Sequence, residues 1–116
     1  MFEKQKENGF TEVVKGVGIK TLVYGDKTLM VEVHFEKGAH LPLHSHPHEQ
    51  TGFLISGQME FQVAGEKHIA EPGDSWNIAG DVEHSAIGLE QSVVIEVFSP
   101  LREEYLAYAS NDEPQK

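Results

Sequence analysis

The residues of this chain best suited to chemistry are histidines crowded into a short stretch near its middle. Within seven residues the sequence contains His44, His46, His48 and Gln50. On an extended strand, side chains two positions apart point to the same face, so His44 and His46 should project together. Pro47 cannot donate to a sheet hydrogen-bond ladder, so a bend there should bring Gln50 back toward the same point. This spacing predicts half of a metal site, and His84 is the obvious candidate for a further ligand from another strand.

The absence of cysteine limits the ligands of such a metal to imidazole, carboxylate and amide oxygen. Three neutral imidazoles and a neutral amide would leave a divalent ion with its whole charge, which makes the ion a stronger electrophile. We therefore expect one divalent metal ion per chain. Zinc, nickel, iron, manganese and copper all accept imidazole, so the identity of the metal stays open. His40 and His48 share the parity of the pair and are alternative ligands or outer partners, although Pro47 interrupts the alternation.

An acidic residue lies inside an otherwise apolar segment near the end of the chain. Glu96 is the one charge in SVVIEVF, residues 92–98, and a buried carboxylate costs several kcal/mol unless it is paired or neutralised. It could point outward, or pair with Arg102 for structural reasons. Alternatively, it shares a face with Val94 and Phe98, lines a cavity, and acts as a general acid or base whose pKa is raised by desolvation. Arg102 could then bind a substrate carboxylate through two parallel hydrogen bonds.

The elements that must position these residues are short strands. Residues 29–35 alternate between apolar and more polar side chains, which is the period of a strand with one buried face. Similar runs recur along the chain, separated by turn signals such as those at 64–66 and 71–74. Regular short strands with almost no helical periodicity predict an all-β fold, an antiparallel double sheet or barrel. Only 101–109, LREEYLAYA, has the pattern of a short helix.

The chain has 116 residues, enough for one domain with a real hydrophobic core. We assign that domain to 10–110, with a flexible arm at 1–9 and a disordered tail at 111–116. Nine basic and nineteen acidic residues give a formal net charge of -10, which disfavours binding to nucleic acid or to an anionic membrane. No signal peptide or membrane span is visible, so the cytoplasm is the expected location.

Two segments resemble the motifs of the cupin family. The first cupin motif is matched, with glutamine where most members have glutamate, by Gly38, His44, His46, Gln50 and Gly57. The second motif is matched more loosely over 73–88, which contains His84. The usual Pro, Gly and Asn of that motif are replaced by Ala79, Asp81 and Gly88. These departures affect loop geometry and leave the histidine in place. The resemblance covers 10–110 and implies a jelly-roll β-barrel.

A narrower resemblance links the chain to the pectin-degradation cupins, which linearise 4,5-unsaturated uronates. It rests on MVEVHFEKGAHLPLHSHPHEQTGFLISG, PGDSW and IEVFSPLREEYL. The resemblance implies metal ligands at His44, His46, Gln50 and His84. It also implies a catalytic trio, which is Asp, Phe and Arg in that family, at Glu96, Phe98 and Arg102. Glutamate therefore replaces aspartate at the first position of the trio.

The resemblance to this family implies that the protein is a homodimeric, metal-dependent isomerase of carbohydrate metabolism that acts on a small anionic sugar. The metal and Arg102 would hold the sugar acid, Phe98 would shape the pocket, and Glu96 would move protons as the ring opens. The product would be a linear 5-keto-4-deoxyuronate.

Two other classes of function remain open. Three histidine ligands with open coordination positions also suit a metal-dependent dioxygenase or another isomerase. The chain could instead be a non-catalytic sugar-binding cupin. Oxygen uptake would indicate a dioxygenase, and binding without turnover would indicate a binder. Whether the protein is an enzyme therefore stays open, and the ligand cluster favours one.

Overall fold

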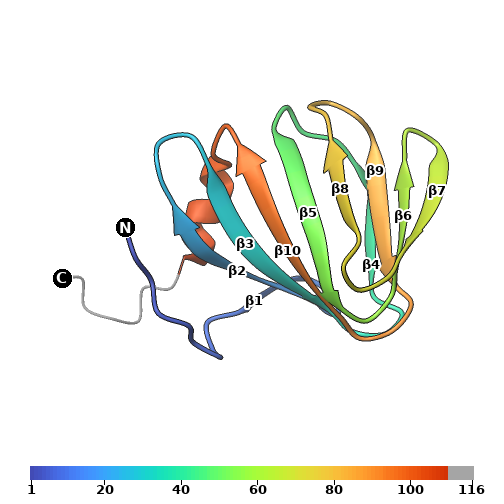
Figure 1. Ribbon diagram of the computed structural model, residues 1–116, viewed down its shortest axis with the longest axis horizontal. Helices are drawn as coiled ribbons and strands as arrows, with labels where there is room; N and C mark the ends of the chain where they lie inside the picture. The colour runs from blue at the N-terminus through green and yellow to red at the C-terminus, as the bar shows by residue number, and fades with distance from the viewer. Residues whose placement is uncertain (110–116) are drawn as a thin grey trace.

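The computed structural model describes residues 1–109, so the tail predicted at 111–116 lies outside the described residues. Ten β-strands follow one another along this part of the chain (Figure 1). Their bounds are β1 Thr11–Val14, β2 Val17–Tyr24, β3 Leu29–Phe35, β4 His40–His44, β5 Glu49–Ser56, β6 Met59–Val63, β7 Glu66–Ala70, β8 Ser75–Ile78, β9 His84–Gly88 and β10 Ser92–Ser99. After them comes one short 3-10 helix, η1, at Glu103–Tyr108.

The strands form two sheets in which every neighbouring pair is antiparallel. The larger sheet has six strands in the order β1-β2-β3-β10-β5-β8, and the smaller has four in the order β4-β9-β6-β7. The last strand, β10, pairs with β3 on one side and with β5 on the other, so the end of the chain closes the middle of the larger sheet. Two antiparallel sheets with crossovers between them form a jelly roll, which confirms the predicted all-β fold.

The hydrophobic core lies between the two sheets. In β3 the predicted alternation is present, because Leu29, Val31, Val33 and Phe35 are buried while the residues between them are partly exposed. Other strands of both sheets contribute further buried side chains, among them Val17, Ile19, Leu54, Met59, Phe61, Val94 and Phe98. Each fully buried side chain of this size contributes about 1.5–3 kcal/mol to stability. The core therefore fixes the strands that carry the polar residues at one end of the barrel.

The segment that follows β10 crosses back over the larger sheet. The helix predicted at 101–109 is present as the shorter 3-10 helix η1, and Tyr105, Leu106 and Tyr108 pack against the core. Thr21 Oγ1 on β2 donates to the carbonyl oxygen of Tyr105 at 2.6 Å, which ties η1 to the sheet. Within residues 1–109, no helix is long and apolar enough to cross a membrane.

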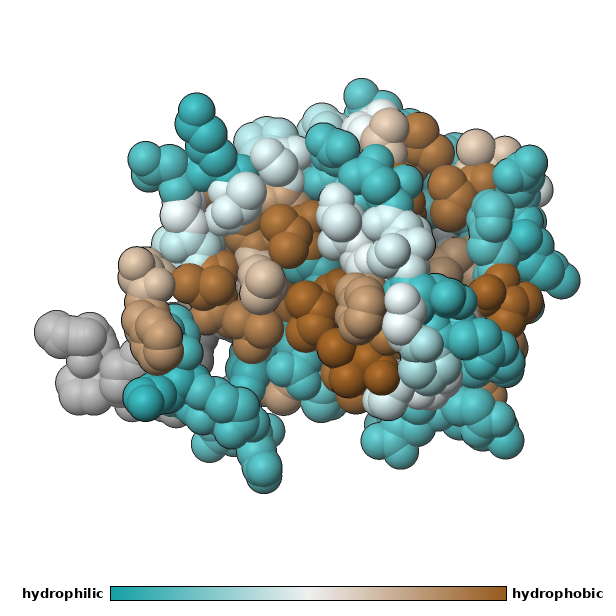
Figure 2. Space-filling model, in the orientation of Figure 1, coloured by the Kyte–Doolittle hydropathy of each residue, from teal (hydrophilic) through white to brown (hydrophobic). Residues whose placement is uncertain are grey.

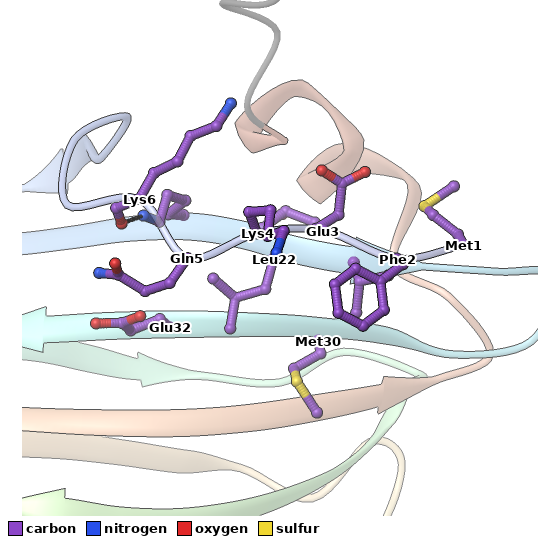
Figure 3. Close-up of a pocket in the computed structure, with 12 residues that line it drawn as sticks. Met1, Phe2, Glu3, Lys4, Gln5, Lys6, Leu22, Met30 and Glu32 are labelled. Atoms are coloured by element: carbon purple, nitrogen blue, oxygen red, sulfur yellow. Dashed lines mark hydrogen bonds between the residues drawn. The ribbon is translucent and has the colours of Figure 1, made fainter.

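Residues 1–10 contain no helix or strand and cross β2 on the outer side of the larger sheet (Figure 3). The buried ammonium of Lys20 donates to the carbonyl oxygens of Lys6 and Asn8 and lies 4.7 Å from the centre of the Phe10 ring. A cavity of about 420 Å³ lies between this segment and strands β2 and β3. Phe2, near the start of this segment, is exposed. The bounds assigned to the arm and the domain stay predictions.

Candidate metal centre

Three histidines from separate parts of the chain meet at one end of the barrel. His44 ends β4, His84 begins β9, and the two are cross-strand partners. His46 lies in the loop between β4 and β5. One potential ligand atom from each ring lies within 4.8 Å of the corresponding atoms of the other two, so this triad could hold a metal ion. The sequence placed His84 with the other two histidines, and the structure brings all three together.

The loop that carries His46 is held by the loop that precedes β9. The bend predicted at Pro47 is present, because β4 ends at His44 and β5 does not begin until Glu49. The backbone N–H of Asp81 donates to the carbonyl oxygen of His46 at 2.7 Å. A Cβ atom at Gly80 would lie 2.4 Å from the carbonyl oxygen of Pro47, so the two loops can approach this closely only with glycine at position 80.

Backbone carbonyl groups fix the orientation of all three imidazoles. In each ring Nδ1 lies within hydrogen-bond distance of a main-chain oxygen: 2.7 Å in His44, 3.0 Å in His46 and 2.8 Å in His84. The acceptors belong to Pro42, His48 and Val82. A proton held at Nδ1 leaves the lone pair at Nε2 free, which is how protein histidines are prepared for a metal. His48 thus supports the cluster through its main chain, and His40 is exposed on β4.

Two polar atoms at the centre of the cluster lack a suitable protein partner. Nε2 of His84 is buried and makes no hydrogen bond. His46 has two neighbours that both accept hydrogen bonds, the carbonyl oxygen of His48 at 3.0 Å and Oε1 of Gln50 at 2.8 Å. Burial, with smaller contributions from Arg102 and His84, lowers the pKa of His46 to about 4, so its ring is neutral and has only one N–H to donate. With that N–H donated to His48, Nε2 of His46 and Oε1 of Gln50 are two acceptors that face each other. A cation bound by both of these atoms and by His84 Nε2 would give each of them a partner, so these residues fit a metal ion.

Gln50 and Glu96 form a hydrogen-bonded pair beside the histidines. Gln50 Nε2 donates to Glu96 Oε2 at 2.8 Å, and Trp76 Nε1 donates to the same oxygen at 3.1 Å. Of the alternatives left open for Glu96, the structure therefore shows the inward orientation. Burial raises the pKa of the Glu96 carboxyl, and the hydrogen bonds from Trp76 and Gln50 oppose that shift.

One cavity joins the predicted site residues. It has a volume of about 50 Å³ and is lined, among others, by His44, Gln50, His84, Glu96, Phe98 and Arg102. His46 adjoins it, with its ring centre 5.7 Å from that of Phe98. Such a volume holds a few water molecules at most. A sugar acid could enter only if a lining side chain moved.

Arg102 lines this cavity and is stacked on aromatic rings. Its guanidinium lies 4.2 Å from the centre of the Tyr105 ring and 5.1 Å from that of Phe98, and only 12% of its side chain is exposed. Its ionic partner is Glu104, whose Oε2 is 3.0 Å from both Nε and Nη2. Burial raises the pKa of the Tyr105 hydroxyl to about 12, so the phenol stays neutral.

Sequence reasoning missed three residues of this site: Trp76, Glu104 and Tyr105. The tryptophan stands in the PGDSW stretch, which entered the sequence analysis only as part of the family resemblance. Glu104 and Tyr105 lie on the predicted helix two and three residues beyond Arg102, and that spacing was the available signal. Pattern alone could not indicate that an aromatic ring stacks on the guanidinium.

Comparison with known proteins agrees with this geometry. Residues 31–98 match the Cupin domain family. Over 102 residues, which are 86% of this chain and 93% of its relative, the chain is 35% identical to the pectin degradation protein KdgF of Dickeya dadantii (strain 3937). The solved structure of KdgF from Halomonas sp. superposes with a TM-score of 0.84 and 32% identity, covering 90% of this chain and 96% of that one.

A second solved structure, an RmlC-like cupin from Shewanella frigidimarina, also superposes with a TM-score of 0.84, at 26% identity, and covers 90% of this chain and 94% of that one. The family match over 31–98 includes both histidine segments. The altered loop residues of the second motif are therefore compatible with the cupin fold. This chain belongs to the cupin family, in which it is a relative of the pectin degradation protein KdgF.

Proposed function

We propose that this protein is a metal-dependent enzyme that converts 4,5-unsaturated uronates to linear 5-keto-4-deoxyuronates. The observation that carries the proposal is the cavity in which histidines of the metal triad, Gln50, Glu96, Phe98 and Arg102 meet. The similarity to the pectin degradation protein KdgF supports a small sugar acid as the substrate.

The metal would be one divalent ion held by His44, His46 and His84, with Gln50 Oε1 as a fourth ligand. When bound, such an ion supplies Lewis-acid polarisation of a substrate hydroxyl or carbonyl oxygen. Because all four ligands are neutral, the ion keeps its full charge and offsets the negative charge of the protein near an anionic substrate. Zinc, nickel, iron and manganese all suit this ligand set.

Arg102 would bind the carboxylate of the sugar acid. Its planar guanidinium matches a carboxylate through two parallel hydrogen bonds. It lines the cavity, stacked on Tyr105, and at its Nε and Nη2 edge it would exchange Glu104 for the substrate carboxylate. Phe98, which is buried beneath the guanidinium, would form the apolar wall of the pocket.

Glu96 would carry the proton that the isomerisation requires. The hydroxyl on C1 loses its proton to Glu96 as the bond between C1 and the ring oxygen breaks, which gives an aldehyde at C1 and an enolate at C5. The enolate becomes a ketone when C4 takes up that proton from Glu96, so the net change is one proton moved from oxygen to carbon. Glu96 Oε1 is the oxygen available for this transfer, because Oε2 accepts the hydrogen bonds of Gln50 and Trp76.

The test of this proposal is the ultraviolet absorbance of the enol ether in a 4,5-unsaturated galacturonate monomer. Metal-loaded protein should accelerate the loss of absorbance over both the spontaneous rate and a chelated control. A loss that only matches the spontaneous rate at full metal occupancy would refute uronate linearisation. Substrate binding without turnover would then indicate a sugar-binding cupin, and oxygen consumption would indicate a dioxygenase.

We also propose that the protein forms a homodimer through the outer face of the larger sheet. Apolar side chains gather over the middle of that face (Figure 2), where Phe53 and Ile55 are 44% and 49% exposed beside Ile95. Exposed apolar patches of this kind commonly mark protein interfaces. Light scattering should give twice the chain mass for the natural protein and the single mass for Phe53→Asp. A monomer in both cases would rule out this interface.

The expected cytoplasmic location stays a prediction.

A further inference from the structure

We propose that Trp76 and Glu96 set the orientation of the Gln50 amide, so that its oxygen and not its nitrogen faces the metal, and that Gly52 is the residue that admits Trp76 to this arrangement. The inference rests on the metal centre proposed above. It assigns to three residues on neighbouring strands a role in metal affinity that is separate from proton transfer.

A glutamine amide can be reversed with little change in shape, so something must select its orientation. Gln50 is only 5% exposed, and its two amide atoms face different partners: Oε1 faces His46 Nε2 at 2.8 Å, and Nε2 faces Glu96 Oε2 at 2.8 Å. Glu96 Oε2 already accepts the indole N–H of Trp76, so it acts as an acceptor here and would repel another oxygen. Reversal of the amide would bring two oxygens together at Glu96 and present an NH₂ group, which cannot ligate, to the histidines. Glu96 therefore selects the orientation that binds a metal.

Glu96 can select this orientation only if its own Oε2 is held in place. Trp76 Nε1 donates to that oxygen at 3.1 Å, and an indole N–H can only donate. The indole is itself fixed against Phe61, with ring centres 4.4 Å apart. The indole therefore anchors the carboxylate that holds Gln50.

Gly52 makes this contact possible because it lies between the two side chains. In the sheet register it is opposite Trp76 on β8 and opposite Glu96 on β10. A Cβ atom at position 52 would lie 2.2 Å from Trp76 Nε1 and 2.3 Å from its Cε2. Gly52 is not among the glycines with positive φ, so the backbone would accept alanine. The space occupied by the indole, and not backbone strain, requires glycine here.

The arrangement resembles the outer hydrogen bonds that orient metal ligands in other proteins, whose loss weakens metal binding by about 10- to 100-fold. Trp76→Phe keeps an aromatic ring against Phe61 and removes the N–H. Gly52→Ala keeps the N–H and displaces the ring that carries it. Both changes act on one contact, so their effects on metal affinity should not add.

The experiment measures the dissociation constant of the full chain for Co²⁺, by competition with a chromophoric chelator, together with the visible absorption bands of the bound ion. We expect Trp76→Phe and Gly52→Ala each to weaken binding by about 10-fold and to shift the Co²⁺ bands. The double variant should match Trp76→Phe alone. Gly25→Ala is the matched control, because a Cβ atom there meets nothing within 4 Å, and it should bind as the natural protein does.

Thermal unfolding of the metal-free variants separates this role from a general loss of stability. If Trp76→Phe lowered the melting temperature but left the Co²⁺ affinity and spectrum unchanged, the indole would be merely structural and the inference would be overturned. Since Trp76→Phe requires no new space, it tests the proposal even if Gly52→Ala does not fold. Failure of the natural protein to bind Co²⁺ would instead remove the metal centre itself.

Discussion

The ion pair between Arg102 and Glu104 should limit how tightly this protein binds a sugar acid. Glu104 Oε2 accepts hydrogen bonds from Nε and Nη2 of Arg102, both at 3.0 Å. We expect a substrate carboxylate to use the same edge of the guanidinium, formed by Nε and Nη2, and therefore to displace Glu104 when it binds. Glu104→Gln keeps the shape of the side chain and removes the competing charge. This substitution should therefore lower KM.

The size of the effect follows from the exposure of the two partners. The Glu104 side chain is 58% exposed and that of Arg102 is 12% exposed, so the pair lies between a surface ion pair and a buried one. Exposed pairs contribute about 0.2–1 kcal/mol, and the upper part of this range applies because Arg102 is covered by aromatic rings. A competing interaction of about 1 kcal/mol corresponds to about a fivefold change in an equilibrium constant. Since Gln can still accept one hydrogen bond, we expect KM to fall about two- to fivefold.

The assay is the loss of enol-ether absorbance at several concentrations of an unsaturated uronate, with metal-loaded protein. The value of kcat should remain unchanged, and the advantage of the variant should shrink at high salt, because the competition is between charges. Glu103→Gln removes one charge from an exposed neighbour and is the matched control. A rise in KM for Glu104→Gln would refute the reasoning, because it would mean that Glu104 positions Arg102 for the substrate.

Three further predictions concern the proton carrier, the metal and the pH dependence of stability. Glu96→Gln should reduce kcat at least 100-fold, measured by the same absorbance assay, and full activity would contradict its proposed role. Chelation should lower the melting temperature in a thermal scan by about 10 °C from that of protein saturated at 100 times the dissociation constant, and an unchanged value would argue against a bound metal. The pKa of His46 in the folded protein, about 4, lies below its usual 6.5, so the unfolded chain binds a proton more readily than the folded one. The contribution of His46 to the free energy of unfolding is therefore complete above pH 6.5 and is lost as the pH falls toward 4. In denaturant unfolding of metal-free protein, the free energy of unfolding should fall by about 2 kcal/mol over this range, after allowance for solvent screening. His46→Gln should lack this fall. Parallel pH profiles of the two proteins would contradict the lowered pKa of His46.

The fold could be predicted from the sequence because its signals are local. The alternation in 29–35 and the turn residues at 64–66 appear in the structure as strand β3 and the link between β6 and β7. The histidine triad could also be predicted, since two of its members are two residues apart and the third lies in a recognisable second segment. Such features depend on residues close together in the chain or on motifs whose order is fixed.

What the sequence could not indicate depends on register between distant strands. The contact of Trp76 with Glu96 exists because Gly52 is opposite both in the sheet, and no pattern within one strand specifies that pairing. The sequence also left the ionic partner of Arg102 undetermined, for a similar reason. Glu96 and Glu104 are both within reach along the chain, and the turn into η1 brings Glu104 to the guanidinium while β10 directs Glu96 inward.

The pairing of Gln50 with Glu96 allows one site to combine an acid with an electrophilic metal. Gln50 leaves the metal its full charge, and its amide also gives Glu96 a neutral donor where a glutamate at position 50 would bring a second negative charge. Two carboxylates this close would repel each other, and one of them would have to hold a proton. Glutamine at position 50 and glutamate at position 96 are therefore coupled choices. Gln50→Glu should weaken the hydrogen bond to Glu96 and reduce activity even if the metal binds more tightly.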